Sequence, residues 1–102
     1  MAKINTSELL ENLAAEIGEN IYIDISKWHL YLADAKLHHV VAEKLYPLIT
    51  DNDVNEKKVI AILESILVKI GGGRRELFLV DLLPVQCQVN LVDILEKYQR
   101  EI

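Results

Sequence analysis

Apolar residues recur at helical spacing near the start of the chain. Asn5 and Glu8, three residues apart, have the form of a capping box with asparagine in the cap position. After them, Leu9, Leu10, Leu13 and Ile17 recur with a period near 3.6 residues. Gly18 is placed where a helix of this length ends. The pattern therefore predicts a first helix that stops near Gly18.

The segment from residue 21 to residue 35 supports two interpretations. Its isoleucines at 21, 23 and 25 alternate with polar residues, as in a half-buried strand. Over a longer window, the spacing also fits a helical period, in which the apolar positions are Ile21, Ile25, Trp28, Leu32 and Ala35. Length favours the helix. We expect either two helices broken at Gly18 or one long helix that retains this glycine at a cost of about 1 kcal/mol.

Three further helices follow from the same periodicity. One covers 37–48 and should end or kink near Tyr46, because Pro47 lacks an amide proton and clashes with the preceding turn. A second opens at the capping pair Asp53 and Glu56 and runs through Val59, Ile60, Leu63, Ile66 and Leu67. A third covers 91–98 and ends near Arg100, with a cap formed by Asn90 and Asp93.

Three consecutive glycines at 71–73 interrupt the helical pattern. The segments 68–70 and 76–80 on either side can close a short hairpin, although a helix extension remains open. Pro84 argues against a central strand beyond this point. The sequence thus predicts a mainly α protein with a single domain over 1–102. Its architecture is a compact bundle of four to five helices, with one short β-hairpin near 68–80 as the open alternative.

Composition favours association with another chain. Of the 102 residues, 51% are hydrophobic, and these include sixteen leucines, twelve isoleucines and nine valines. A domain of this size has a high surface-to-volume ratio, so part of that apolar surface can stay exposed and pair with a second copy or another protein. We therefore expect a homo-oligomer or a protein partner. The net charge of −5 repels phosphate backbones and argues against nucleic-acid binding.

Cysteine content and hydropathy indicate a reducing, aqueous compartment. The lone Cys87 excludes an intrachain disulfide, and we expect it to be a small buried hydrophobe rather than a nucleophile. The opening residues contain no continuous apolar run of the kind found in signal peptides. The longest uncharged stretch, Leu82 to Val92, is too short to span a bilayer. We therefore expect no membrane span and a location in the cytoplasm or plastid stroma.

The most distinctive local motif is a glycine run followed by two arginines. Successive glycine amides can form an anion-binding nest, and the adjacent guanidinium groups can clamp a phosphate or carboxylate. The motif fits neither a P-loop nor a dinucleotide-binding fingerprint, and a solvated hairpin tip is the simpler interpretation. The candidate anion-binding residues are Gly71, Gly72, Gly73, Arg74 and Arg75.

Histidines and aromatic residues provide weaker candidates. Asp34–His38 and His39–Glu43 have the spacing of a shared helix face, but zinc needs at least three convergent protein ligands. We therefore assign no metal site and no cofactor. Trp28 is expected to anchor the core, whereas the positions of Tyr22, Tyr31 and His29 stay open. No nucleophile motif is present, so the sequence favours a protein that is not an enzyme.

Three strings are distinctive enough to suggest a family. They are YIDISKWHLYLADAKLH at 22–38, AEKLYPL at 42–48, and GGGRRELFLVDLLPVQCQVNLVDILEKY at 71–98. The chain resembles a group of small proteins of unknown function from cyanobacteria and related plastid-bearing lineages. The resemblance implies a photosynthetic lineage but no activity, cofactor or catalytic residue. Two functions remain: a non-enzymatic protein–protein interaction or assembly module, and a small-ligand or anion-binding protein that uses residues 71–75.

Overall fold

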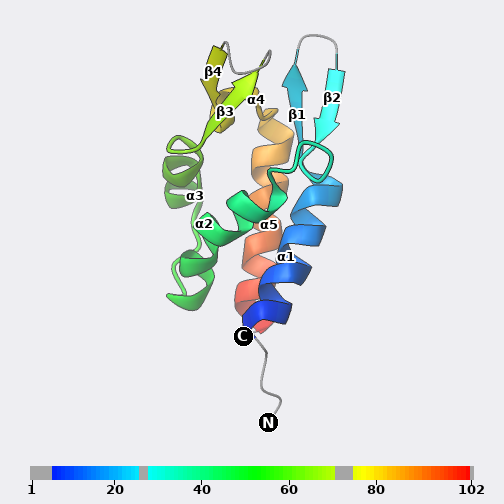
Figure 1. Ribbon diagram of the computed structural model, residues 1–102. Coiled ribbons are helices and arrows are strands. Elements are labelled where there is room, and N and C mark those ends of the chain that lie inside the picture. Colours follow the sequence, from blue (N-terminus) through cyan, green and yellow to red (C-terminus); the bar gives the residue numbers. More distant parts are fainter. Residues whose placement is uncertain (1–5, 26–27, 71–74, 102) are drawn as a thin grey trace.

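The computed structural model describes residues 6–25, 28–70 and 75–101, which form five helices and four short strands (Figure 1). The helices are α1 (Thr6–Asn20), α2 (His38–Thr50), α3 (Glu56–Leu63), α4 (Leu79–Leu82) and α5 (Val85–Glu101). The strands are β1 (Tyr22–Ile25), β2 (Trp28–Tyr31), β3 (Leu67–Ile70) and β4 (Arg75–Phe78). The predicted mainly α fold of five helices is confirmed, and it carries two hairpins.

The helices enclose one aliphatic core. α1 and α5 run side by side in opposite directions, while α2 contacts both of them and α3 packs against α2 and α5 (Figure 1). Each helix contributes fully buried side chains, among them Leu13, Ile17, Leu45, Leu63, Leu79, Leu91 and Leu95. Cys87 lies in this core as predicted, with 1% of its surface exposed. Among the described residues, no helix combines the length and hydropathy that crossing a membrane requires.

The expected helix over 21–35 is wrong, because this segment forms the antiparallel hairpin β1–β2. Its register pairs Tyr22 with Tyr31 and Ile25 with Trp28. Alternation was the correct signal, since Ile21 and Ile23 are buried. The helical interpretation required Trp28 in the core, yet 75% of its surface is exposed. A hairpin buries the isoleucines on one face without burying this indole.

The second hairpin lies where the glycine run predicted a turn. β3 and β4 are antiparallel, with Leu67 opposite Phe78 and Ile70 opposite Arg75. One further backbone bond, from the amide of Leu79 to the carbonyl of Ile66 (2.8 Å), continues the ladder toward α4. The alternative of a helix extension is therefore excluded for these segments.

Two helices end slightly later than expected, α1 two residues after Gly18 and α2 four residues after Tyr46. α1 continues through Gly18 to Asn20, because the glycine serves a close contact with the chain beyond the first hairpin rather than a helix stop. α2 continues through Pro47 to Thr50. Pro47 is exposed, so water can reach the carbonyl that loses its amide partner. Its own carbonyl accepts a bond from the amide of Asp51 (2.9 Å), which closes the last turn.

The predicted caps lie elsewhere as well. The N-cap of α3 is Asn55, whose side-chain oxygen accepts a bond from the amide of Lys58 (2.9 Å). Asp53 instead forms an ion pair with the ammonium group of Lys58. Asn90 is inside α5 and accepts a bond from the side chain of Gln86 (3.1 Å), so α5 begins right after Pro84 and not at Asn90. Asn5, the expected first cap, lies outside the described residues.

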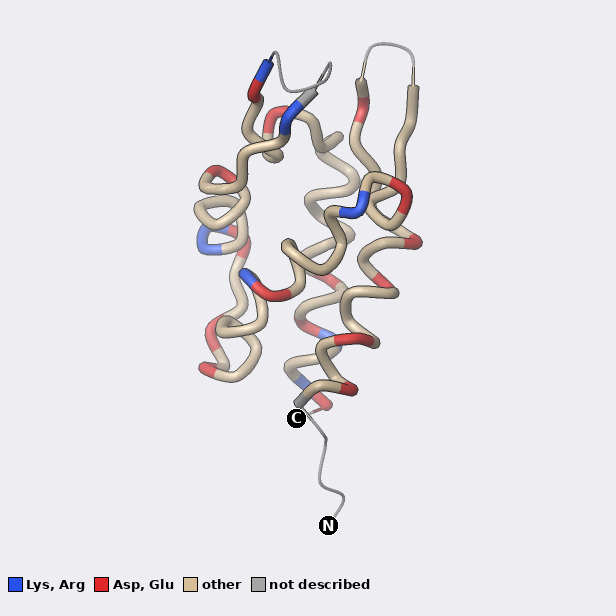
Figure 2. The backbone as a smooth tube through the Cα atoms, in the orientation of Figure 1, with Lys and Arg blue, Asp and Glu red and all other residues tan. Residues whose placement is uncertain are grey.

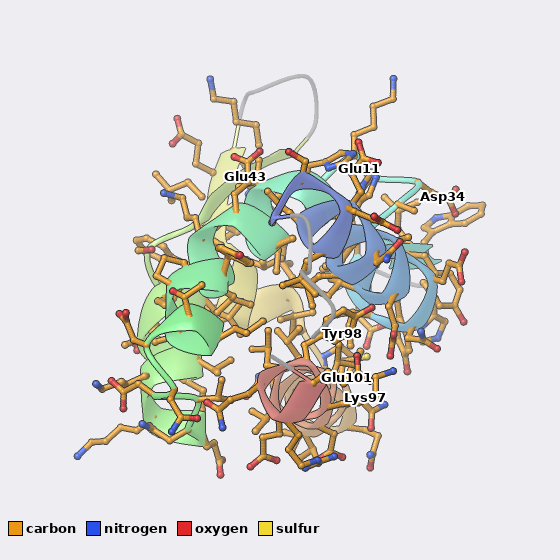
Figure 3. The ribbon with its side chains drawn as sticks, turned by 90° about the horizontal axis from the view of Figure 1, so that it is seen from below. Glu11, Asp34, Glu43, Lys97, Tyr98 and Glu101 are labelled. Atoms are coloured by element: carbon orange, nitrogen blue, oxygen red, sulfur yellow. The ribbon has the colours of Figure 1, made fainter. Side chains whose placement is uncertain are left out.

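A polar clamp joins the second half of α1 to the last two turns of α5. The carboxylate of Glu16 lies 2.5 Å from the ammonium nitrogen of Lys97 and accepts a bond from the hydroxyl of Tyr98 (3.1 Å). Figure 3 shows Lys97 and Tyr98 together on this face. Burial of Tyr98 and the negative charge of Glu16 raise the pKa of Tyr98 to about 12. The clamp thus favours the protonated phenol.

We expect this clamp to weaken at alkaline pH. The folded pKa of Tyr98 is raised above its ordinary value of 10, so its stabilising effect is complete below pH 10 and is lost as the pH rises through 12. The free energy of unfolding should fall by on the order of 1–2 kcal/mol over this range because of Tyr98. Urea unfolding of the wild type and of Tyr98→Phe measures it. The difference between the two proteins cancels the other groups that titrate there, and parallel profiles would contradict the assignment.

Candidate interaction surface

Both hairpins project from the same end of the molecule, which we call the hairpin end and define as strands β1 to β4. In Figure 1 it lies opposite the end where α1 begins and α5 finishes. The two hairpins form separate two-stranded sheets, so each strand has only one hydrogen-bonded neighbour among the described residues. Every strand therefore has an unpaired edge at this end, which is where proteins usually add cover or bind a partner.

Large apolar side chains are exposed at the hairpin end. Four of the seven exposed large hydrophobic residues in the described ranges belong to its strands: Trp28 (75% exposed), Leu67 (50%), Phe78 (45%) and Tyr31 (43%). Two more, Val85 and Val89, belong to the first half of α5, which follows β4 and α4 in the chain. Apolar surface gathered in one region marks an interaction site more often than single exposed residues do.

An apolar groove separates the two hairpins. It is a cavity of about 330 Å³ whose lining includes Ile23 and Leu30 from the first hairpin and Leu67 and Val68 from the second. Lys69 is the one charged residue in its lining. The groove could not be predicted from the sequence, because its two hairpins are more than 30 residues apart in the chain. Within each hairpin the alternation of apolar residues was visible, but the face that each would present was not.

Charge is distributed unevenly between the hairpins and the helices. In the sequence, segments 22–31 and 67–78 contain four lysines and arginines and two acidic residues, a net charge of +2. The remainder of the chain then carries a net charge of −7, which with the +2 of these segments gives the total of −5. Figure 2 shows basic positions on β3 and β4 and acidic positions along α1. The excess of +2 comes from Lys27 and Arg74, which lie outside the described residues, whereas the strands carry Lys69 and Arg75 against Asp24 and Glu76. The hairpin end therefore has no net charge, while the rest of the chain is acidic.

Aromatic rings pack along the base of the first hairpin. The ring of Tyr22 meets those of His29 and Tyr31 edge-on, at centroid distances of 4.8 and 5.6 Å. The neighbouring Cys87, then burial and the charge of Asp24, raise the pKa of Tyr22 above its ordinary value. Trp28, expected in the core, is outside this cluster. The expectation that Trp28 is buried is the largest error of the predictions made from the sequence.

The predicted anion-binding motif lies mostly outside the described residues. This holds for Gly71, Gly72, Gly73 and Arg74, whereas Arg75 is the exposed first residue of β4. The motif therefore stays a prediction. Its one described member contributes a cation to the hairpin end.

The histidines lie beside a separate cleft of about 370 Å³ between α1 and α2. Its lining includes Glu11, Glu19, His38 and His39, and the two imidazole centroids are 4.3 Å apart. Asp34 lies in the turn before α2 and not on a helix, so its predicted helix face with His38 is wrong. Figure 3 shows Asp34 on the far side of Glu11 from Glu43. Within the described ranges, no three potential ligands converge on a metal site.

Comparison with known proteins identifies relatives over nearly the whole chain. The model of one family, described as "Protein of unknown function (DUF3181)", matches residues 10–98. A relative from the cyanobacterium Synechocystis sp., the thylakoid-associated protein slr0729, is 42% identical over 95 residues, which cover 93% of this chain and 94% of the relative. No solved structure matches the chain significantly.

Proposed function

The chain belongs to the DUF3181 family of unknown function, which confirms its resemblance to small cyanobacterial proteins, and we propose that it is a non-enzymatic interaction module that attaches to thylakoid membranes by its hairpin end. The observation that carries this proposal is the gathering of exposed Trp28, Tyr31, Leu67 and Phe78 on two neighbouring hairpins. The non-enzymatic part rests on the sequence, which contains no recognised catalytic motif.

Apolar side chains that are exposed to water favour binding, because burying them lowers the free energy. Each exposed aromatic or leucine side chain that becomes buried on binding contributes about 25 cal/mol per Å² of apolar area. The helices already bury their apolar faces against one another, whereas the hairpins leave large side chains in water. An attachment that covers the hairpin end therefore gains more than one that covers α2, where Val40 is the single exposed large hydrophobic residue described.

The similarity to the Synechocystis relative supports the thylakoid membrane as the place of attachment. That protein is described as thylakoid-associated, and its identity with this chain extends over almost the full length of both. The predicted location, cytoplasm or plastid stroma, is the compartment that faces a thylakoid surface. The predicted homo-oligomer or protein partner remains a prediction beside this proposal. No described contact favours the alternative function, anion binding at residues 71–75.

Membrane fractionation in a cyanobacterial host tests the proposal. We expect the tagged wild-type chain to sediment with thylakoid membranes, and Trp28→Ser with Leu67→Ser to reduce the membrane-bound fraction several-fold, because this pair removes apolar surface from both hairpins. Val40→Ser on α2 is the matched control and should sediment like the wild type. A wild-type chain that stays in the supernatant, or a double variant that stays bound, would overturn the proposal.

A further inference from the structure

We propose that the hairpin end docks directly on an anionic lipid bilayer, with Trp28 at the boundary between headgroups and acyl chains and with Lys69 and Arg75 against the headgroups. This inference rests on the proposed attachment to membranes and names the surface that is bound. It makes lipid, rather than a membrane protein, the partner of the hairpins.

The register places Trp28 and Arg75 at the outer ends of their strands. Trp28 pairs with Ile25 at the tip side of the first hairpin, and Arg75 pairs with Ile70 at the tip side of the second. The strands of both hairpins extend away from the helices toward the same end of the molecule (Figure 1). Tyr31 is at the opposite end of its strand, nearer the helices. Of the described strand residues, the pairs that contain Trp28 and Arg75 are therefore the ones farthest from the helices on their hairpins.

The exposure of Trp28 fits a bilayer better than a protein pocket. Trp28 does not line the groove between the hairpins, and 75% of its surface is open to solvent. A projecting indole needs a surface that can yield around it, and a fluid headgroup layer does so. Tryptophan is enriched at membrane interfaces because its ring is apolar while its N–H can still be hydrated.

Charge complementarity orients the molecule on the membrane. Lys69 and Arg75 are exposed on the second hairpin, and so is Glu76. Asp24 lies 2.8 Å from Nδ1 of His29, and Glu76 stands opposite Lys69 in the register. Each lysine or arginine near an anionic surface strengthens binding about fivefold. The strands have no net charge, so an anionic surface repels them less than it repels the acidic helices, and Lys69 and Arg75 supply the attraction to headgroups.

Distance keeps the acidic body from cancelling this attraction. Salt screens exposed charges beyond about 8 Å at physiological ionic strength. α5 has 17 residues and is therefore roughly 25 Å long, so most of the acidic side chains on the helices lie more than one screening length from a surface that touches the hairpins. The net charge of −5 does not prevent docking in this orientation.

The single tryptophan makes the docking directly measurable. We expect the fluorescence of Trp28 in the purified full chain to shift to the blue with vesicles of phosphatidylcholine containing about 30 mol% phosphatidylglycerol, and to stay unchanged with phosphatidylcholine alone. Lys69→Gln with Arg75→Gln should weaken binding about 10- to 30-fold. Lys44→Gln with Lys57→Gln removes the same charge from α2 and α3 and should change it less than about twofold. Circular dichroism of each variant confirms that it folds.

The possible outcomes separate lipid docking from the broader proposal. If anionic vesicles leave the tryptophan spectrum unchanged while membrane fractionation still depends on Trp28, the partner is a thylakoid protein and the lipid inference is wrong. If the two charge variants weaken binding equally, attraction is not located at the hairpin end and the inference is also wrong. A dimeric mass in which Trp28 is already shielded before vesicles are added would assign the hairpin end to a second copy instead.

Discussion

Replacing Leu45 by alanine is expected to lower the free energy of unfolding by about 3 kcal/mol, whereas Trp28→Ala should change it by less than about 0.5 kcal/mol. Leu45 is completely buried on α2, the helix that contacts both α1 and α5. Its removal loses the transfer free energy of the side chain and leaves a cavity that three helices cannot close. Trp28 has 75% of its surface in water, so its truncation leaves no cavity.

Urea unfolding followed by circular dichroism compares the two variants. The slope of the free energy with urea should stay the same in both, because neither change alters how much surface unfolding exposes. The comparison is demanding because tryptophan is the larger side chain, and volume alone would rank the two variants in the opposite order. A loss of 3 kcal/mol in Trp28→Ala would show that the indole is buried, and would remove the main observation behind the hairpin end as an interaction surface.

This error about Trp28 shows where sequence patterns lose information. Two periods overlap between residues 21 and 35, since Ile21 and Ile25 fit both a strand face and a helix stripe. Segment length was used to choose between them, and it favoured the helix. The deciding feature was the antiparallel pairing of residues 22–25 with residues 28–31, on a strand where Trp28 and His29 are exposed. Neither residue type signals exposure, so the hairpin was not predictable from local pattern alone.

Elements with one strong local signal were predicted well. The helical stripe beginning at Leu9 corresponds to α1, and the hairpin expected around the glycine run corresponds to the pairing of β3 with β4. Caps were predicted poorly, because the same few polar residues also occupy turns and helix surfaces. Asn90 and Asp93 have the spacing of a cap but lie within α5, where Asn90 bonds to Gln86. Local spacing cannot tell whether an asparagine begins a helix or lies one turn inside it.

The candidate surface was beyond sequence analysis for a different reason. Leu67 and Phe78 are ordinary apolar strand residues, and nothing in their neighbours indicates that they stay exposed. Their role arises from the packing of α4 against β1 and β4, which places the second hairpin beside the first. The charge asymmetry between the hairpins and the helices was present in the sequence. It became visible only when segments 22–31 and 67–78 were known to share one end.

Replacing Gly18 by valine is the second change with a large expected effect, a loss of about 3 kcal/mol or more in the free energy of unfolding. A Cβ atom at this position would lie 2.8 Å from Cβ of Ala33 and 3.1 Å from Cβ of His38. Neither neighbour can move aside by rotating a side chain, because each of these atoms is fixed to its backbone. The amide of Ala33 also donates to the carbonyl of Gly18 (3.2 Å), so the clash disturbs this bond.

Gly18→Ala tests the competition between helix propensity and close packing. Alanine favours a helix interior over glycine by about 1 kcal/mol, whereas overpacking at this contact costs about 1–3 kcal/mol. We expect packing to win, with a net loss of about 1 kcal/mol, although propensity alone predicts a gain. Ala15→Val on the exposed side of α1 is the control for β-branching and should cost less than about 0.7 kcal/mol.

The double variant Gly18→Ala with Ala33→Gly isolates the contact itself. Moving the methyl group from one side to the other removes the 2.8 Å approach between the two Cβ atoms, while the distance to His38 stays short. We therefore expect a favourable coupling of about 1 kcal/mol between the two substitutions in a thermodynamic cycle. Additive losses would mean that α1 and the turn after β2 can separate at little cost. A stabilised Gly18→Ala single variant would show directly that Gly18 is not held by this contact, and that only the helix propensity of the residue matters there.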